Sequence, residues 1–165
     1  MIPIDIDDAR RAAERLRPYL GPTPLRDYPP LDRAVGMGIR VLVKHENHQP
    51  TNAFKVRNGV SAVTALDLEQ RRRGVIAATR GNHGLGVAWA GKRLGVPVMV
   101  VVPHNNNREK NAAIRGLGAE LVEEGADYDE SVAAAERLMA EGGMTLIHSA
   151  NNREVLAARF SGFTS

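Results

Sequence analysis

The spacing of apolar residues along the chain predicts an alternation of helices and strands. Apolar residues recur every three or four positions, as on one face of a helix, in residues 9–20, 52–66, 83–94, 108–117 and 128–140. Short apolar runs of strand length lie at residues 40–44, 75–79, 96–103, 120–123 and 144–148. One of these, 96–103, is apolar throughout, which is typical of a strand covered on both faces.

Polar residues and helix breakers indicate where these elements begin and end. We expect Asp7 and Asp8 to cap the first helix and Asn52 to cap the second. Segment 21–38 is rich in proline and glycine, so it is expected to be extended or looped. Residues 46–51 are expected to form the loop after the first strand.

From Gly74 onward, four predicted strands alternate with helices, and short turns join them. Strands connected through helices in this way form parallel pairs with right-handed crossovers. The sequence therefore predicts an α/β fold with a parallel sheet. After Ala150 the chain offers one further short helical run and no strand.

The composition is typical of a globular protein of one or at most two small domains, because 43% of the 165 residues are hydrophobic. The 22 basic and 19 acidic residues are interspersed, so nucleic acid is not an expected partner. The absence of cysteine suits a reducing compartment. The N-terminus lacks a signal-peptide core and no apolar run has membrane-spanning length, so we expect a cytoplasmic protein without a membrane partner.

Lys55 is the first candidate for chemistry. It lies near a predicted helix start, after the polar pair Thr51 and Asn52 and the aromatic Phe54, in the segment PTNAFKVRNG. A lysine there is either an ordinary surface residue or a nucleophile whose amine is activated by burial and by the field of the helix N-terminus. Spacing alone leaves both interpretations open.

A second candidate site is the segment TRGNHGLG, residues 79–86, between a predicted strand end and the next helix. Open parallel sheets bind ligands at such turns, where free backbone amides and the helix dipole favour an anion. The segment has neither the GxGxxG spacing of a dinucleotide site nor the ending of a P-loop. The alternative is a tight turn with a purely structural role.

Other polar groups give weaker signals. His45 and His48 lack a third ligand, so no metal site is expected. His104 and the asparagines at 105–107 are expected to close a strand and cap the next helix. His148 is followed by Ser149 but has no third partner for a hydrolase triad.

Together the two candidate segments resemble the (S/T)-x-(S/A)-F-K-x-R-G and S-x-G-N-H-x-x-G-x-A motifs of the threonine/serine dehydratase family, which are pyridoxal-phosphate enzymes of fold type II. The similarity extends from about residue 21 to residue 158. The sequence around Lys55 most resembles that of members associated with ectoine or hydroxyamino-acid degradation. The resemblance implies a tryptophan-synthase-β-like fold with a parallel-sheet small domain, residues 55–149. Residues 1–54 would begin the large cofactor domain, and residues 150–165 would return to it.

The resemblance also assigns roles to residues. Lys55 would form the imine bond with pyridoxal phosphate and then move substrate protons, since the ring acts as an electron sink. Phe54 would pack beside the cofactor, and Asn82 would hydrogen-bond its ring hydroxyl. The substrate carboxylate would bind to the turn made by Thr79, Arg80, Gly81, Asn82 and His83. The implied reaction removes water from a β-hydroxy amino acid such as threonine or serine, and releases a 2-oxo acid and ammonia.

Three residues depart from the family pattern. Asn52 and Asn58 stand where glycine is common, and either could loosen the site if glycine is needed there. Arg80 stands where serine racemases carry a serine, which disfavours serine or threonine racemisation relative to elimination. Arg80 is also placed to bind a second carboxylate, so a hydroxyaspartate-like substrate is an alternative to a role in the loop only.

Family members continue for about as long again, with a glycine-rich loop for the cofactor phosphate and a residue facing the pyridine nitrogen. Neither is found in the 165 residues, so we expect a chain truncated at its C-terminus. The full-length parent would be a homo-oligomer, such as a dimer, acting on a small amino acid. The alternative is an inactive remnant that binds anions or a partner subunit.

Overall fold

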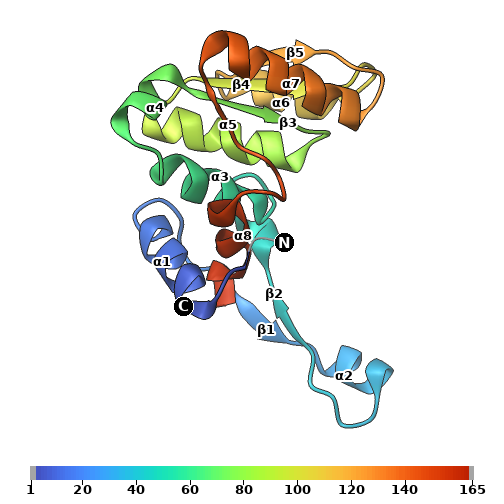
Figure 1. Ribbon diagram of the computed structural model, residues 1–165. Coiled ribbons are helices and arrows are strands. Elements are labelled where there is room, and N and C mark those ends of the chain that lie inside the picture. Colours follow the sequence, from blue (N-terminus) through green and yellow to red (C-terminus); the bar gives the residue numbers. More distant parts are fainter. Residues whose placement is uncertain (1–2, 164–165) are drawn as a thin grey trace.

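The computed structural model describes residues 3–163. The α-helices are α1 (Ile6–Leu16), α2 (Pro29–Val35), α3 (Lys55–Thr64), α4 (Leu68–Arg73), α5 (Asn82–Leu94), α6 (Arg108–Gly116), α7 (Tyr128–Gly142) and α8 (Arg153–Phe160). The strands are β1 (Leu25–Asp27), β2 (Leu42–Lys44), β3 (Val75–Ala78), β4 (Val98–Val102), β5 (Glu120–Glu123) and β6 (Thr145–Leu146). Short 3₁₀ turns lie at Glu46–His48 and Ser161–Phe163. Figure 1 shows these elements in space.

The centre of the molecule is a sheet of four parallel strands in the order β5-β4-β3-β6. Its two inner strands are largely buried because helices cover both faces. Val75 and Ala77 of β3 join the apolar cluster that includes α5 and α6, while Ile76 and Ala78 join the one that includes α7. This alternation is the period of a strand. The predicted α/β fold with a parallel sheet is confirmed.

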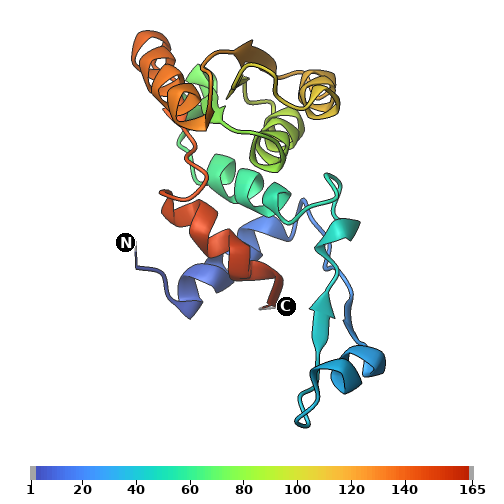
Figure 2. The same cartoon turned by 90° about the vertical axis from the view of Figure 1, so that its right-hand side faces the viewer.

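Further layers extend below the sheet in Figure 1: α5 lies under the sheet, α3 packs under α5, and α1 and α8 pack under α3. Helix α6 joins the same apolar cluster as α5. The segment from β1 through α2 to β2 projects away from these layers, as the rotated view in Figure 2 also shows. Strands β1 and β2 pair antiparallel with each other. Helix α3, which begins at Lys55, is therefore held between two layers of helices.

The structure corrects several predicted boundaries in the first part of the chain. Asp5, and not Asp7 or Asp8, is the N-cap of α1, and Asp8 completes a capping box by accepting the Asp5 backbone N–H. Segment 21–38 contains the strand β1 and the helix α2. Two of its prolines, Pro29 and Pro30, lie in the first turn of α2, where proline is tolerated. The strands at 40–44, 75–79, 96–103 and 144–148 are shorter than expected. Helix α4 was not expected at all.

The contact between α3 and α5 depends on two glycines whose backbones touch the opposite helix. A Cβ atom added to Gly59 would overlap the carbonyl group of Gly86, and a Cβ atom added to Gly86 would overlap the carbonyl group of Lys55. No side chain fits between the helices at this crossing. The start of α3 is thereby held directly against the first turns of α5.

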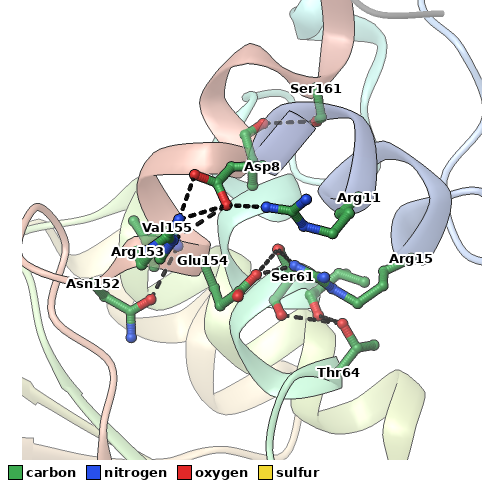
Figure 3. Close-up of polar contacts among 12 residues, drawn as sticks. Asp8, Arg11, Arg15, Ser61, Thr64, Asn152, Arg153, Glu154, Val155 and Ser161 are labelled. Atoms are coloured by element: carbon green, nitrogen blue, oxygen red, sulfur yellow. Dashed lines mark hydrogen bonds and ion pairs between the residues drawn. The ribbon is translucent and has the colours of Figure 1, made fainter. Parts of the chain in front are cut away.

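On its other side, α3 is tied to α1 and α8 by a group of polar contacts that we call the α1–α8 clasp: Asp8, Arg11, Arg15, Ser61, Arg153 and Glu154 (Figure 3). The Asp8 carboxylate accepts hydrogen bonds from Arg11 at 2.6 Å and from Arg153 at 2.9–3.0 Å. Glu154 pairs with Arg15 and accepts a hydrogen bond of 3.3 Å from Ser61 of α3. The pKa of Asp8 is lowered, first by the backbone N–H of Asp5 and then by the arginines, against the opposing effect of burial. The clasp fixes the position of α8.

The glycine crossing leads to a prediction about stability. Gly86→Ala should lower the free energy of unfolding by about 2–3 kcal/mol, because the new methyl group pushes two backbones apart. Gly116→Ala is the matched control, since a Cβ atom at Gly116 meets nothing within 4 Å. The control should leave stability unchanged or raise it by up to about 1 kcal/mol. Urea unfolding measures both, and equal effects of the two substitutions would contradict the role of the crossing.

Candidate active site

Lys55 is the first residue of α3, and its side chain is half-buried. Burial lowers the pKa of its amine, and the nearby positive charge of Arg159 lowers it further. The ammonium nitrogen lies 5.4 Å from the centre of the Phe54 ring. A lysine with a lowered pKa keeps more of its amine in the neutral, nucleophilic form at neutral pH.

The segment before Lys55 is held by a buried ion pair. Arg57 is buried and donates hydrogen bonds of 2.8 and 3.0 Å to the two carboxylate oxygens of Glu46. Thr23 donates a third hydrogen bond to Glu46 at 2.5 Å. Burial raises the pKa of Glu46, but these partners outweigh burial and the pKa is lowered overall. Arg57 thus anchors the first turn of α3 to the preceding chain.

The turn after β3 presents backbone amides at the start of α5. The Thr79 hydroxyl accepts hydrogen bonds from the amides of Gly81 at 2.9 Å and Gly84 at 3.2 Å, so these groups are occupied within the turn. Within residues 3–163 the amides of Asn82 and His83 have no such partner. They are the donors that a bound anion would meet, at the positive end of the helix dipole.

The His83 side chain points into the core and away from that role. Its Nε2 lies 2.8 Å from the carbonyl oxygen of Ile147, so Nε2 carries the proton and donates it. Nδ1 is buried and has no partner in the described part of the chain. Burial lowers the pKa of His83 to about 4; the Ile147 carbonyl opposes this shift, and the nearby charges of Lys55, His148 and Arg159 add to it. His83 is a neutral link between α5 and Ile147, the residue after β6.

Asn82 is exposed at the first position of α5 and contacts a residue that the sequence did not single out. Lys110, in the first turn of α6, donates a hydrogen bond of 2.8 Å from Nζ to the Asn82 amide oxygen. The Cγ and Cδ atoms of Lys110 would lie 3.9 and 4.0 Å from a Cβ atom added to Gly81. The Lys110 side chain therefore passes beside the turn.

Arg80 is exposed and lines a polar cavity at the carboxyl ends of the strands. The cavity has a volume of about 250 Å³, and the other residues around it are Pro103, His104, Asn105, Asn106, Asn107 and Ala126. As expected, Asn107 caps α6 by accepting the backbone N–H of Lys110 at 2.9 Å. Arg80 forms no ion pair within residues 3–163.

The two asparagines that replace common glycines have different environments. Asn52 is not the N-cap of α3: it has a positive φ of 53°, which asparagine tolerates better than most residues. Asn58 lies one turn after Lys55 and is fully buried, and neither its amide oxygen nor its amide nitrogen has a partner among the described residues. An unpaired buried amide is costly, so Asn58 lowers the stability of this helix.

The weaker candidates have local structural contacts. His45 Nε2 lies 2.6 Å from the Tyr28 hydroxyl, and the described residues contain no group of three or more side chains suited to a metal ion. His148 Nδ1 accepts backbone hydrogen bonds from Ala150 and Asn151. Ser149 lies 3.2 Å from the Tyr128 hydroxyl. These contacts organise loops.

Sequence reasoning missed Lys110 and Arg159 as neighbours of the site. Arg159 lies in the last turn of α8, donates a hydrogen bond of 2.7 Å to the Ser149 carbonyl, and has a buried Nε without a partner in the described chain. No motif marks it, because its place depends on the packing of α8. For Lys110 a weak signal existed: it follows β4 in the first turn of the next helix, at the edge where parallel sheets bind ligands.

The site combines a lysine of lowered pKa with an amide-lined turn at the edge of a parallel sheet. A site of this class can bind a carbonyl cofactor through the lysine and an anionic substrate through the amides. Comparison with known proteins identifies the family. Residues 16–163 match the family described as pyridoxal-phosphate dependent enzyme. The chain belongs to this family, which confirms the resemblance found in the sequence and the fold type II architecture.

Similar proteins include dehydratases and a racemase. The chain is 38% identical over 139 residues to the biosynthetic L-threonine dehydratase IlvA of Pasteurella multocida, covering 84% of the chain and 27% of that protein. It is 33% identical over 156 residues to the catabolic L-threonine dehydratase TdcB of Staphylococcus aureus, covering 94% of the chain and 45% of that protein. The structure of maize serine racemase aligns with this chain with a TM-score of 0.89 at 31% identity, and the alignment covers 96% of the chain and 47% of the racemase.

The chain therefore spans less than half the length of these relatives. None of the helices within residues 3–163 is long and apolar enough to cross a membrane.

The environment of His83 predicts how stability depends on pH. The unfolded chain binds a proton at His83 near the ordinary pKa of 6.5, whereas the folded chain does so only near pH 4. Stability should therefore fall as the pH falls through this window, by about 2 kcal/mol between pH 7 and pH 5. In His83→Gln, whose amide can still donate to Ile147, urea unfolding should lack this loss. If the free energy of unfolding falls equally with pH in the two proteins, His83 is not the source of the loss.

Proposed function

We propose that this protein is the lysine-bearing part of a pyridoxal-phosphate-dependent ammonia-lyase that removes water from a β-hydroxy amino acid such as threonine or serine. The observation that carries the proposal is the packing of Lys55, with its lowered pKa, directly against the helix whose first turn has free amides. The two dehydratases reported above support this reaction class. The expected products are a 2-oxo acid and ammonia.

The residues present fit the cofactor in three respects. Lys55 offers an amine whose pKa is lowered, Asn82 has free amide hydrogens, and Phe54 is 37% exposed beside the lysine. When bound, pyridoxal phosphate supplies an electron sink for the reaction. The chain's own contribution is to hold the reacting lysine, to orient the ring through Asn82, and to bind the substrate.

The substrate carboxylate is proposed to bind to the backbone amides of Asn82 and His83. Thr79 contributes indirectly, because its hydroxyl holds the turn through Gly81 and Gly84. Lys55 is proposed to take the α-proton of the substrate, because the neutral form of its amine is a base and its lowered pKa makes that form more accessible. His83 is not proposed as a proton carrier, because its buried side chain is committed to Ile147.

Arg80 and its polar cavity favour a second candidate function, the dehydration of a hydroxyaspartate-like substrate. A guanidinium group surrounded by asparagine amides offers several donors of the kind that bind a carboxylate. This substrate class would use Arg80 for its second acid group. Racemisation of serine or threonine and an inactive remnant are the remaining alternatives, and no contact in the site favours either one.

The proposal for Lys55 can be tested by trapping the cofactor with borohydride and mapping the labelled peptides. The chain has four lysines, Lys44, Lys55, Lys92 and Lys110. In the folded protein at neutral pH, Lys55 should be labelled preferentially, because each unit by which the pKa falls raises the neutral fraction about tenfold. Lys55→Ala should remove the label and the exposed control Lys92→Ala should not. Even labelling of all four lysines would contradict the proposal.

The Arg80 candidate predicts a preference for dicarboxylates. Succinate should bind the protein more tightly than butyrate, which has the same carbon chain with a single acid group, in a calorimetric titration. Arg80→Gln should weaken succinate binding about tenfold, because one charge-assisted contact is lost. Equal affinities of the parent protein and the variant for succinate would exclude this function for the cavity.

A further inference from the structure

Lys110 occupies a position that stability alone does not explain. It lies in the first turn of α6, and its ammonium group reaches the first residue of α5. The N-termini of α5 and α6 both carry partial positive charge, which disfavours a cation between them. Within residues 3–163, Lys110 forms no ion pair that would compensate for this placement. Among the described residues, the one side chain to which its ammonium group is hydrogen-bonded is that of Asn82.

The contact with Lys110 decides which end of the Asn82 amide is available. An ammonium group has three donors and no acceptor, so the amide atom that it contacts at 2.8 Å must be the oxygen. The other end of the amide is the Nδ2 group, which has no partner among the described residues. Asn82 is thereby presented to a ligand as a donor. If the amide were turned over, its oxygen would face the ligand as an acceptor.

We infer that Lys110 is a positioning residue that orients the Asn82 amide for the ring hydroxyl oxygen of the cofactor. The inference rests on the proposed function, which assigns that contact to Asn82. When it is ionised, the cofactor oxygen can only accept hydrogen bonds, so a donor amide attracts it and an acceptor oxygen would repel it. The Lys110 stem passes beside Gly81, because its Cγ and Cδ atoms lie at ordinary van der Waals distance, 3.9 and 4.0 Å, from where a Cβ atom of residue 81 would be.

The first part of the test needs no cofactor. Lys110→Met removes the ammonium group and keeps a flexible apolar stem beside Gly81. In NMR spectra of the ligand-free protein, the side-chain amide signals of Asn82 should shift in this variant, stay in place in the control Lys92→Met, and return toward their original positions in Lys110→Arg. The midpoint of thermal unfolding should stay the same or rise in Lys110→Met. Unchanged Asn82 signals would overturn the inference.

The second part measures pyridoxal-phosphate affinity by equilibrium dialysis in a double-mutant cycle. Lys110→Met should weaken binding about three- to tenfold in the parent protein and have little effect when Asn82 is already alanine, because the two residues act through one contact. Independent, additive effects would overturn the inference while leaving the proposed function intact. Failure of the parent protein itself to bind the cofactor, with Asn82 signals still responding to Lys110, would instead overturn the proposed function.

Discussion

The arrangement of the site depends on the close contact between α3 and α5. Gly59 and Gly86 let the two backbones touch, so the carbonyl group of Lys55 lies against α5 with no side chain between them. Backbone contact of this kind leaves little freedom for the two helices to slide or rotate, because interiors are packed without spare volume. The lysine and the amide-lined turn are consequently parts of one rigid unit, although they are separated in the sequence.

Electrostatics divides the molecule into two kinds of region. Around α1 and α8, carboxylates are paired with arginines, as in the Asp8 and Glu154 contacts of the α1–α8 clasp. Around the start of α5, cationic side chains gather with no anionic partner among the described residues: Lys55, Arg80, Lys110 and Arg159. An excess of positive charge beside free amides favours an anionic ligand. The α1–α8 clasp contributes to this excess of positive charge, because it holds α8, and therefore Arg159, near Lys55.

Asn58 shows that the site region is not optimised for stability alone. Its buried, unpaired amide opposes folding, whereas Arg57 in the same helical turn donates two hydrogen bonds to Glu46. Strain or unpaired groups near a site are tolerated when the surrounding structure holds them in place. Here α3 is enclosed by α5 on one side and by α1 and α8 on the other.

The sequence by itself determined the parallel α/β architecture and the family, and it indicated the two segments proposed to form the site, because strand and helix periods and local motifs are short-range properties of the chain. It misplaced the caps at Asp8 and Asn52 and missed β1 and α2, where proline and glycine have several compatible conformations. It also missed the short helix α4. Only the tertiary structure decided that His83 turns into the core and that Lys110 and Arg159 approach the site. Those contacts join residues distant in sequence, and they depend on how whole helices pack.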